Sequence, residues 1–260
     1  MSEKVGKKGN EKADYPFKRN FSKNANITRI KSNVQNASFY SDDEYLNETA
    51  GSKFIPEKID SANVKNETRK KEEKVYVIPL GGIEEIGKNM TAFQYKDEII
   101  IVDAGLTFPE DEHLGIDVII PDFSYLESNR DKVKALLLTH GHEDHIGGIP
   151  FLLQIVPIPI IYASPLACAM IRRKLEEHRL TNATKLVQIN RESLIKTKHF
   201  SVGFFNVNHS IPEAMGVIIN TENGRIVETG DFKFDLTPVA QAADYQRISF
   251  MGETGVGLLL

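Results

Sequence analysis

The sequence predicts a mixed α/β (α+β) domain that is preceded by a long disordered arm. Two observations predict this division. Residues 1–73 are rich in Asn, Lys, Ser and Glu, and their aromatic residues follow neither a helical nor a strand period. From residue 74 onward, short apolar and β-branched runs bounded by turn residues come first, and helical segments then alternate with further strands. That pattern is typical of a domain that packs helices on sheets.

The arm, residues 1–73, cannot bury enough apolar surface to offset an ordering cost of about 1–2 kcal/mol per residue. It holds 15 Lys/Arg and 12 Asp/Glu, a balance of +3, so residues 74–260 carry −7 of the total of −4. A basic tail with aromatic residues has the means to contact RNA through phosphates and bases. A solvated tail without a specific partner is the favoured interpretation, because acidic residues soon dilute the basic charge.

Composition excludes several classes of protein. The chain has one cysteine, Cys168, which rules out a disulfide framework and a cysteine-rich zinc site and favours a reducing compartment. We expect Cys168 to be a buried core residue. The chain has no run of about 18 apolar residues, and its basic N-terminus is not followed by an apolar stretch. We therefore expect a soluble, cytoplasmic protein without a membrane partner.

The secondary structure follows from apolar runs and their end signals. Strands are predicted at 75–78, 90–95, 99–102, 135–138, 158–162, 185–189, 200–207, 216–220, 226–228 and 255–260. A helix is predicted over 146–156 and another over 165–179, the latter with Ser164 as N-cap and Pro165 in its first turn. The final predicted strand runs to the last residue, which leads us to expect that the chain stops within a domain.

The strongest chemical signal is the segment Thr-His-Gly-His-Glu-Asp-His-Ile-Gly-Gly at 139–148, which follows an apolar strand directly. His140, His142 and His145 fall within six residues, although the chain has only seven histidines. Imidazole and carboxylate ligands together suit zinc or another borderline divalent ion, and a pair of such ions forms a hydrolytic site. A surface cluster of histidines without a metal is the alternative, and this density disfavours it.

Three further residues come directly after predicted strands, where loops carry ligands. His209 follows the strand that ends at 207, Asp231 follows the strand that ends at 228, and Asp103 follows the strand that ends at 102. Taken alone, each is more often a cap or a hydrogen-bonded core residue. Together with the histidine cluster, His209 and Asp231 become candidate ligands, and Asp103 a candidate for orienting the histidines.

This order of residues resembles the metallo-β-lactamase superfamily, and flanking segments resemble ribonuclease J within its β-CASP family. The segments are Leu-Gly-Gly-Ile-Glu-Glu-Ile-Gly-Lys-Asn-Met-Thr at 80–91, Ile-Pro-Asp-Phe-Ser-Tyr-Leu at 120–126, Asn-His-Ser-Ile-Pro-Glu at 208–213 and Thr-Gly-Asp-Phe-Lys-Phe-Asp at 229–235. The resemblance covers about residues 75–260. Glu84 stands where glycine is common in that family, and Glu213 stands where aspartate is usual.

The resemblance implies an incomplete metallo-β-lactamase αββα sandwich over 74–260, without the β-CASP and C-terminal domains of the family. It also implies two divalent metals, for which zinc is preferred and manganese is the alternative. The implied ligands are His140, His142 and His209 for the first metal, and Asp144, His145 and the bridging Asp231 for the second. Asp144, Asp231 and His209 would be catalytic, Asp103 would orient the histidines, and Ser210 would hydrogen-bond near the substrate phosphate.

The implied activity is two-metal hydrolysis of RNA, as a 5′-to-3′ exonuclease with endonuclease activity in RNA maturation, rRNA processing and mRNA decay. The implied partner is single-stranded RNA with a 5′-monophosphate, the longer protein would form homodimers or homotetramers, and contact with a helicase or the ribosome is left open. We expect the 260-residue chain alone to be inactive. The alternatives are a truncated, non-catalytic fragment and a small-molecule hydrolase of the same superfamily.

Overall fold

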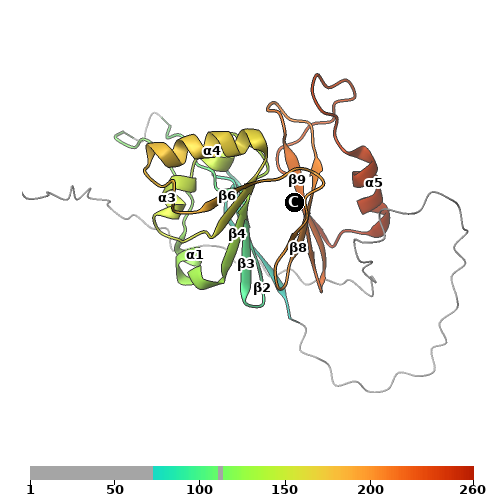
Figure 1. Cartoon of the computed structure of the whole chain (residues 1–260), viewed down its shortest axis with the longest axis horizontal. Helices are drawn as coiled ribbons and strands as arrows, with labels where there is room; N and C mark the ends of the chain where they lie inside the picture. The colour runs from blue at the N-terminus through green and yellow to red at the C-terminus, as the bar shows by residue number, and fades with distance from the viewer. Residues whose placement is uncertain (1–72, 111–113) are drawn as a thin grey trace, which may run out of the picture.

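The structure is a computed structural model that describes residues 73–110 and 114–260. The arm predicted for 1–73 lies outside these residues, except for Glu73. The described chain forms two β-sheets that pack face to face, with helices on the two outer faces (Figure 1). The predicted αββα sandwich is therefore confirmed.

The first sheet has six strands that pair in chain order. They are β1 (Val75–Gly81), β2 (Met90–Tyr95), β3 (Glu98–Val102), β4 (Val133–Leu137), β5 (Ile160–Ala163) and β6 (Lys185–Gln188). The first three strands are antiparallel, with a turn at Lys96 and Asp97, and the pairs from β3 to β6 are parallel. All six strands were predicted, with ends that differ by at most three residues.

The second sheet has five strands in the order β11-β10-β9-β8-β7. They are β7 (Ile195–Lys196), β8 (Ser201–Asn206), β9 (Met215–Thr221), β10 (Gly224–Glu228) and β11 (Leu258–Leu259). The sequence did not reveal β7, which has only two residues. The strand predicted over 255–260 is wrong in length, because 255 is a glycine with a φ of 90° that follows a helix.

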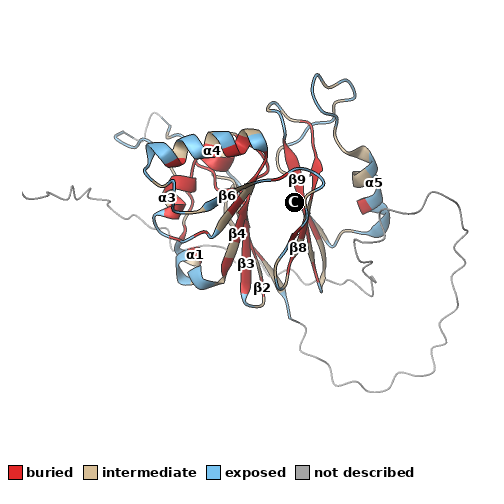
Figure 2. Ribbon diagram, viewed as in Figure 1, coloured by how far each residue is buried: buried red, intermediate tan, exposed pale blue. Residues whose placement is uncertain are grey.

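Strand β3 is buried along its whole length, and its side chains alternate between two cores. In β3, Ile100 and Val102 pack between the sheets against residues such as Val217, while Ile99 and Ile101 point to the helical side. Figure 2 shows that buried residues concentrate in strands such as β3, β4, β8 and β9. The continuous apolar run at 99–102 is thus explained by a strand enclosed on both faces.

Helices cover the outer faces of the sandwich. They are α1 (Ser124–Ser128), α2 (Glu143–Ile146), α3 (Ile149–Leu153), α4 (Pro165–Glu177) and α5 (Tyr245–Thr254), with a short 3-10 helix at Arg130–Lys132. α3 and α4 pack on the first sheet and α5 packs on the second (Figure 1). As predicted, α4 begins after Ser164, whose Oγ accepts a hydrogen bond from the amide of Ala167 at 3.3 Å.

One helix prediction needs correction, and further helices were not predicted. The single helix expected over 146–156 is wrong, because α2 ends before Gly147-Gly148 and a separate α3 begins at Ile149. Pro150 has no amide hydrogen and fits only the first turn of a helix, so it forces a new start there. Helices α1 and α5 were not predicted. None of the helices in the described part of the chain is long and apolar enough to cross a membrane.

Candidate metal centre

The candidate site lies at one edge of the sandwich, where strands of both sheets end. Strand β4 ends at Leu137, and the loop after it carries His140 and His142 before α2 supplies His145. His209 follows β8 in the second sheet, and Asp231 follows β10. Two residues distant in sequence therefore reach the histidine cluster from the opposite sheet.

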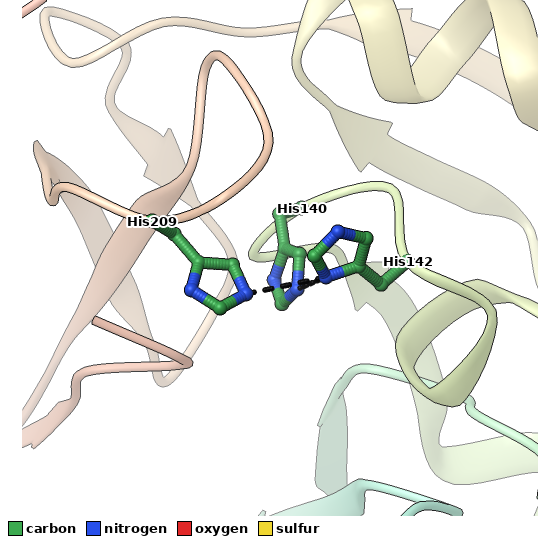
Figure 3. A group of neighbouring side chains, drawn as sticks. All are labelled: His140, His142 and His209. Atoms are coloured by element: carbon green, nitrogen blue, oxygen red, sulfur yellow. Dashed lines mark hydrogen bonds between the residues drawn. The ribbon is translucent and has the colours of Figure 1, made fainter. Parts of the chain in front are cut away.

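Five side chains form two overlapping groups of donor atoms. His140, His142 and His209 make up the first group, and His140, His145 and Asp231 make up the second, with the ligand atoms of each group within 4.8 Å of one another. Figure 3 shows the first group, in which the three rings point toward one another from two loops. His140 belongs to both groups and is almost fully buried.

The nitrogen atoms of the first group are spaced as ligands of one cation would be. Nδ1 of His142 lies 3.0 Å from Nε2 of His140 and 3.2 Å from Nε2 of His209. Nitrogen ligands at the corners of a tetrahedron around zinc are separated by about 3.3 Å. Lone pairs of neutral imidazoles that face one another repel unless a proton or a cation lies between them. The donor set therefore fits a divalent metal.

Asp103 fixes the orientation of His145. Its Oδ2 lies 2.6 Å from Nδ1 of His145, and both side chains are buried. The same carboxylate accepts hydrogen bonds from the amide of Thr139 at 2.9 Å and from its hydroxyl at 2.7 Å. With Nδ1 engaged by Asp103, Nε2 of His145 is turned toward Asp231, 3.5 Å away. A carboxylate behind a histidine in this way sets its tautomer and the direction of its free nitrogen.

Burial and the contacts within the site shift the pKa values of its side chains. Burial, reinforced by the neighbouring His145, lowers the pKa of His140 to about 3, so this ring is a neutral donor. Burial also lowers the pKa of His145, but the carboxylate of Asp103 outweighs it and raises that pKa to about 10. The hydrogen bond to His145 lowers the pKa of Asp231 to about 2, and burial lowers the pKa of His209.

Asp144 lies beside the two groups without being one of their close donors. Its Oδ2 is 3.6 Å from Nε2 of His145 and accepts a hydrogen bond from Nδ2 of Asn89 at 3.3 Å. Nδ2 of Asn89 also lies 3.1 Å from Nε2 of His145. Asn89 was not singled out from the sequence, although it belongs to the segment 80–91 that carries the family resemblance. Ser210 follows His209 and is exposed.

Two glycines allow the close approach of the loops. Gly230 has a φ of 57°, and a Cβ there would lie 2.8 Å from Cβ of Thr139, so the turn that presents Asp231 needs glycine. A Cβ on Gly105 would lie 1.6 Å from the backbone oxygen of Asp144. The backbone behind Asp103 therefore packs directly against α2, which keeps Asp103 and His145 in register.

Glu228, the last residue of β10, was missed by the sequence interpretation. Its Oε2 is buried without a hydrogen-bond partner among the described residues. Burial, followed by the neighbouring Asp103, raises the pKa of this carboxyl well above its ordinary value. Glu228 therefore adds a carboxyl with a raised pKa behind the site, and no pattern in the sequence distinguishes it from an ordinary strand-end residue.

Comparison with known proteins gives the family. The model of the metallo-β-lactamase superfamily matches residues 84–242. Ribonuclease J 1 of Streptococcus pyogenes is 57% identical over 190 residues, which are 73% of this chain and 34% of that protein. Ribonuclease J of Mycoplasma pneumoniae is 48% identical over 184 residues, 71% of this chain and 32% of that protein. The chain thus spans about a third of the length of these relatives.

Among solved structures, the metallo-β-lactamase fold protein YhfI of Bacillus subtilis aligns with a TM-score of 0.43 and 21% identity, covering 62% of this chain and 64% of that one. The family resemblance predicted from the motifs is confirmed by the match to ribonuclease J sequences. The superfamily model extends over more than half of the sequence and includes every residue of both donor groups, and the chain therefore belongs to the metallo-β-lactamase superfamily.

Proposed function

We propose that the chain is the metal-binding part of a ribonuclease that cleaves phosphodiester bonds with two divalent metals. The observation that supports this most directly is the pair of donor groups that share His140. Similarity to ribonuclease J sequences supports RNA as the substrate. Within this proposal, residues 74–260 are the first part of a catalytic domain, and 1–73 are an arm outside it.

The first metal would be held by His140, His142 and His209. The second would be held by His145 and Asp144, with Asp231 between the two. A metal pair of this kind activates water for in-line attack and neutralises the charge that develops on the phosphate oxygens. The ligand types suit zinc and also tolerate manganese.

The other roles fall to side chains of this chain. Asp144 would accept the proton of the attacking water, because its carboxylate is held at the edge of the site by Asn89. Asp103 would keep Nε2 of His145 directed into the site. Ser210, exposed beside His209, would donate a hydrogen bond to a phosphate oxygen of the substrate.

Charge indicates where the RNA would bind. Residues 74–260 carry −7, whereas an RNA-binding surface needs basic residues to neutralise phosphates. We therefore propose that the cationic RNA channel belongs to the part of the ribonuclease J relatives that this chain does not span. The 5′-to-3′ exonuclease activity with a 5′-monophosphate preference, the endonuclease activity, homo-oligomer formation and a cytoplasmic location are proposals for that longer protein. Contact with a helicase or the ribosome is a further proposal for that longer protein.

The test has two arms. Metal content and calorimetric titration of the 260-residue chain should give two zinc or manganese sites, and His142→Ala should remove one of them. Cleavage of a 5′-monophosphorylated RNA should then be measured with the chain alone and within any longer protein that contains it. Asp231→Ala should abolish cleavage. Undiminished cleavage by the Asp231→Ala protein would refute the two-metal mechanism, and turnover of a thioester or lactam by the chain would indicate a small-molecule hydrolase instead.

A further inference from the structure

The position of His209 depends on contacts between the two halves of the sandwich, each of which is one sheet with the helices on its outer face. In the first donor group, His140 and His142 sit on one loop after β4, whereas His209 comes from the loop after β8. His209 must nevertheless lie within 3.2 Å of His142, and it is only partly buried. The loop at 208–214 is therefore the element that sets this distance.

The first end of the loop is fastened within its own half. The backbone oxygen of Asn208 accepts a hydrogen bond from the amide of Lys233 at 2.7 Å. Its side chain donates to the backbone oxygen of Gln241 at 2.9 Å and accepts from the amide of Ala243 at 3.1 Å. These bonds hold the loop to the 233–243 segment, but they do not bring it toward the loop of His140.

The other end of the loop is bonded to the first half at two places. The amide of Met215, directly after the loop, donates to the backbone oxygen of Thr139 at 2.9 Å, and the side chain of Glu213 reaches α4. Oε2 of Glu213 accepts a hydrogen bond from the amide of Leu166 at 2.7 Å, in the first turn of α4. The hydrogen bond from Leu166 to this carboxylate is charge-assisted, and the carboxylate also faces the positive end of the helix dipole. Glu213 has a φ of 62°, a left-handed conformation that few residues other than glycine adopt.

Glu213 completes the capping of α4. The first helical residue is Pro165, which has no amide hydrogen, and the amide of Ala167 is bonded to Oγ of Ser164. The amide of Leu166 is the donor left over by this local cap, and Glu213 accepts from it. The helix end is thus satisfied by one local acceptor, Ser164, and by one acceptor from the opposite half.

The loop is also in contact with the ligand loop itself. A Cβ placed on Gly141, between His140 and His142, would lie 3.4 Å from Cδ1 of Ile211 and 2.8 Å from Sδ of Met170 in α4. The histidine loop, the 208–214 loop and α4 therefore meet at one point. A displacement of the 208–214 loop away from α4 would move His209 away from its partners.

We propose that Glu213 is a positioning residue, which ties the 208–214 loop to α4 and so holds His209 opposite His140 and His142 before any metal arrives. The inference rests on the metal site of the proposed function, but it concerns the metal-free chain. It also gives a role to the position at which this chain departs from the aspartate usual in the resembling family.

The first experiment is hydrogen exchange of the metal-free 260-residue chain. Glu213→Ala should increase exchange of the amides of residues 207–214 by about tenfold or more. Glu213→Gln retains an oxygen that can accept from Leu166 and should stay within about threefold of the wild type. Ser164→Ala is the matched control, because it removes the other acceptor at the same helix end and should leave exchange at 207–214 unchanged.

The second experiment is titration with Co²⁺, followed by its visible absorption. Glu213→Ala should weaken binding at the group of His140, His142 and His209 by about tenfold, a loss typical of residues that orient ligands, and Ser164→Ala should not. His209→Ala identifies the signal of that group. If the wild type binds no Co²⁺, the proposed metal site fails while the exchange data still decide the role of Glu213. Wild-type exchange in Glu213→Ala, or equal loosening in Ser164→Ala, would overturn the inference.

Discussion

The carboxylate of Asp103 lies 2.6 Å from Nδ1 of His145 inside the protein, where both side chains are buried. Asp103 has a φ of 59°, and its carboxylate also accepts hydrogen bonds from the amide and the hydroxyl of Thr139, the residue before His140. One side chain therefore sets the direction of His145 and the start of the loop that carries His140 and His142.

Replacing this carboxylate by an amide tests that relationship. In Asp103→Asn the amide NH₂ can donate to Nδ1 of His145, which favours the tautomer with the proton on Nε2 and removes the lone pair that faces the site. We expect zinc affinity of the second group to fall by about 10- to 100-fold, measured by competition with a chelator. Asp103→Ala should in addition lower the free energy of unfolding by about 3 kcal/mol, because it leaves a buried partner unpaired. The exposed Asp131→Asn is the control, and equal affinities in both Asn variants would contradict the prediction.

A second prediction concerns the close contact between Gly105 and α2. A Cβ on Gly105 would lie 1.6 Å from the backbone oxygen of Asp144, so Gly105→Ala must displace backbone and should destabilise the chain by about 3 kcal/mol. Gly203→Ala is the matched control, because the nearest atom to its Cβ would be 4.0 Å away. Urea unfolding should show no loss of stability for that control beyond about 1 kcal/mol. Similar losses in both variants would mean that the contact at Gly105 is unimportant.

The single cysteine gives a third prediction. Cys168 is fully buried in α4, with Sγ 3.4 Å from the backbone oxygen of Ala163 and 3.7 Å from that of Val187. Burial raises the pKa of its thiol to about 11, and thiolate is the reactive form. Iodoacetamide at pH 8 should therefore leave the native chain unmodified over hours and alkylate it completely in guanidinium chloride. Rapid alkylation of the native chain would show that α4 opens readily.

The fourth prediction concerns pH. The carboxylate of Asp97 lies 3.1 Å from Nζ of Lys198 and 2.6 Å from Nε2 of His199, which join the first sheet to the second. The hydrogen bond to Lys198, with that to His199, lowers the pKa of Asp97 from 3.8 to about 2. A carboxyl whose pKa is lower in the folded state than in the unfolded state stabilises the fold at pH values above its ordinary pKa. This contribution disappears as pH falls from about 4 to about 2.

Asp97→Asn should therefore be less stable than the wild type at pH 7, and the two unfolding curves should converge as pH falls through that window. Asp97 and Lys198 are both exposed, so high salt should reduce the difference in stability at pH 7. A difference that stays constant down to pH 2 would assign the effect to packing and not to charge.

The predictable parts of the fold and the site share a property, which is that their signals are local in sequence. The apolar run at 99–102 predicts β3 because both of its faces are buried. Ser164 and Pro165 predict the start of α4, and the spacing of His140, His142 and His145 predicts a metal site. Helix α5 escaped prediction because much of its surface is exposed and only Met251 is buried, so its apolar pattern is weak.

The parts that escaped prediction depend on contacts between distant residues. Asn89 reaches Asp144 across 55 positions, and Glu213 reaches Leu166 across 47. No pattern near either residue in the sequence predicts its partner. The two-residue strand β7 exists only because β8 pairs with it. Such features follow from the closed sandwich, and a one-dimensional pattern does not contain them.

The candidate ligands come from both sheets, so an ion bound by them would link ion binding to the stability of the entire sandwich. His140, His142 and His145 follow strand β4 of the first sheet, while His209 and Asp231 follow strands of the second sheet. An unfolded chain does not bring these groups together, so the free energy of ion binding adds to the free energy of folding. An ion at 100 times its dissociation constant would contribute about 2.7 kcal/mol. Chelators should therefore lower the melting temperature of both sheets together, and the melting temperature should report ion occupancy without any substrate.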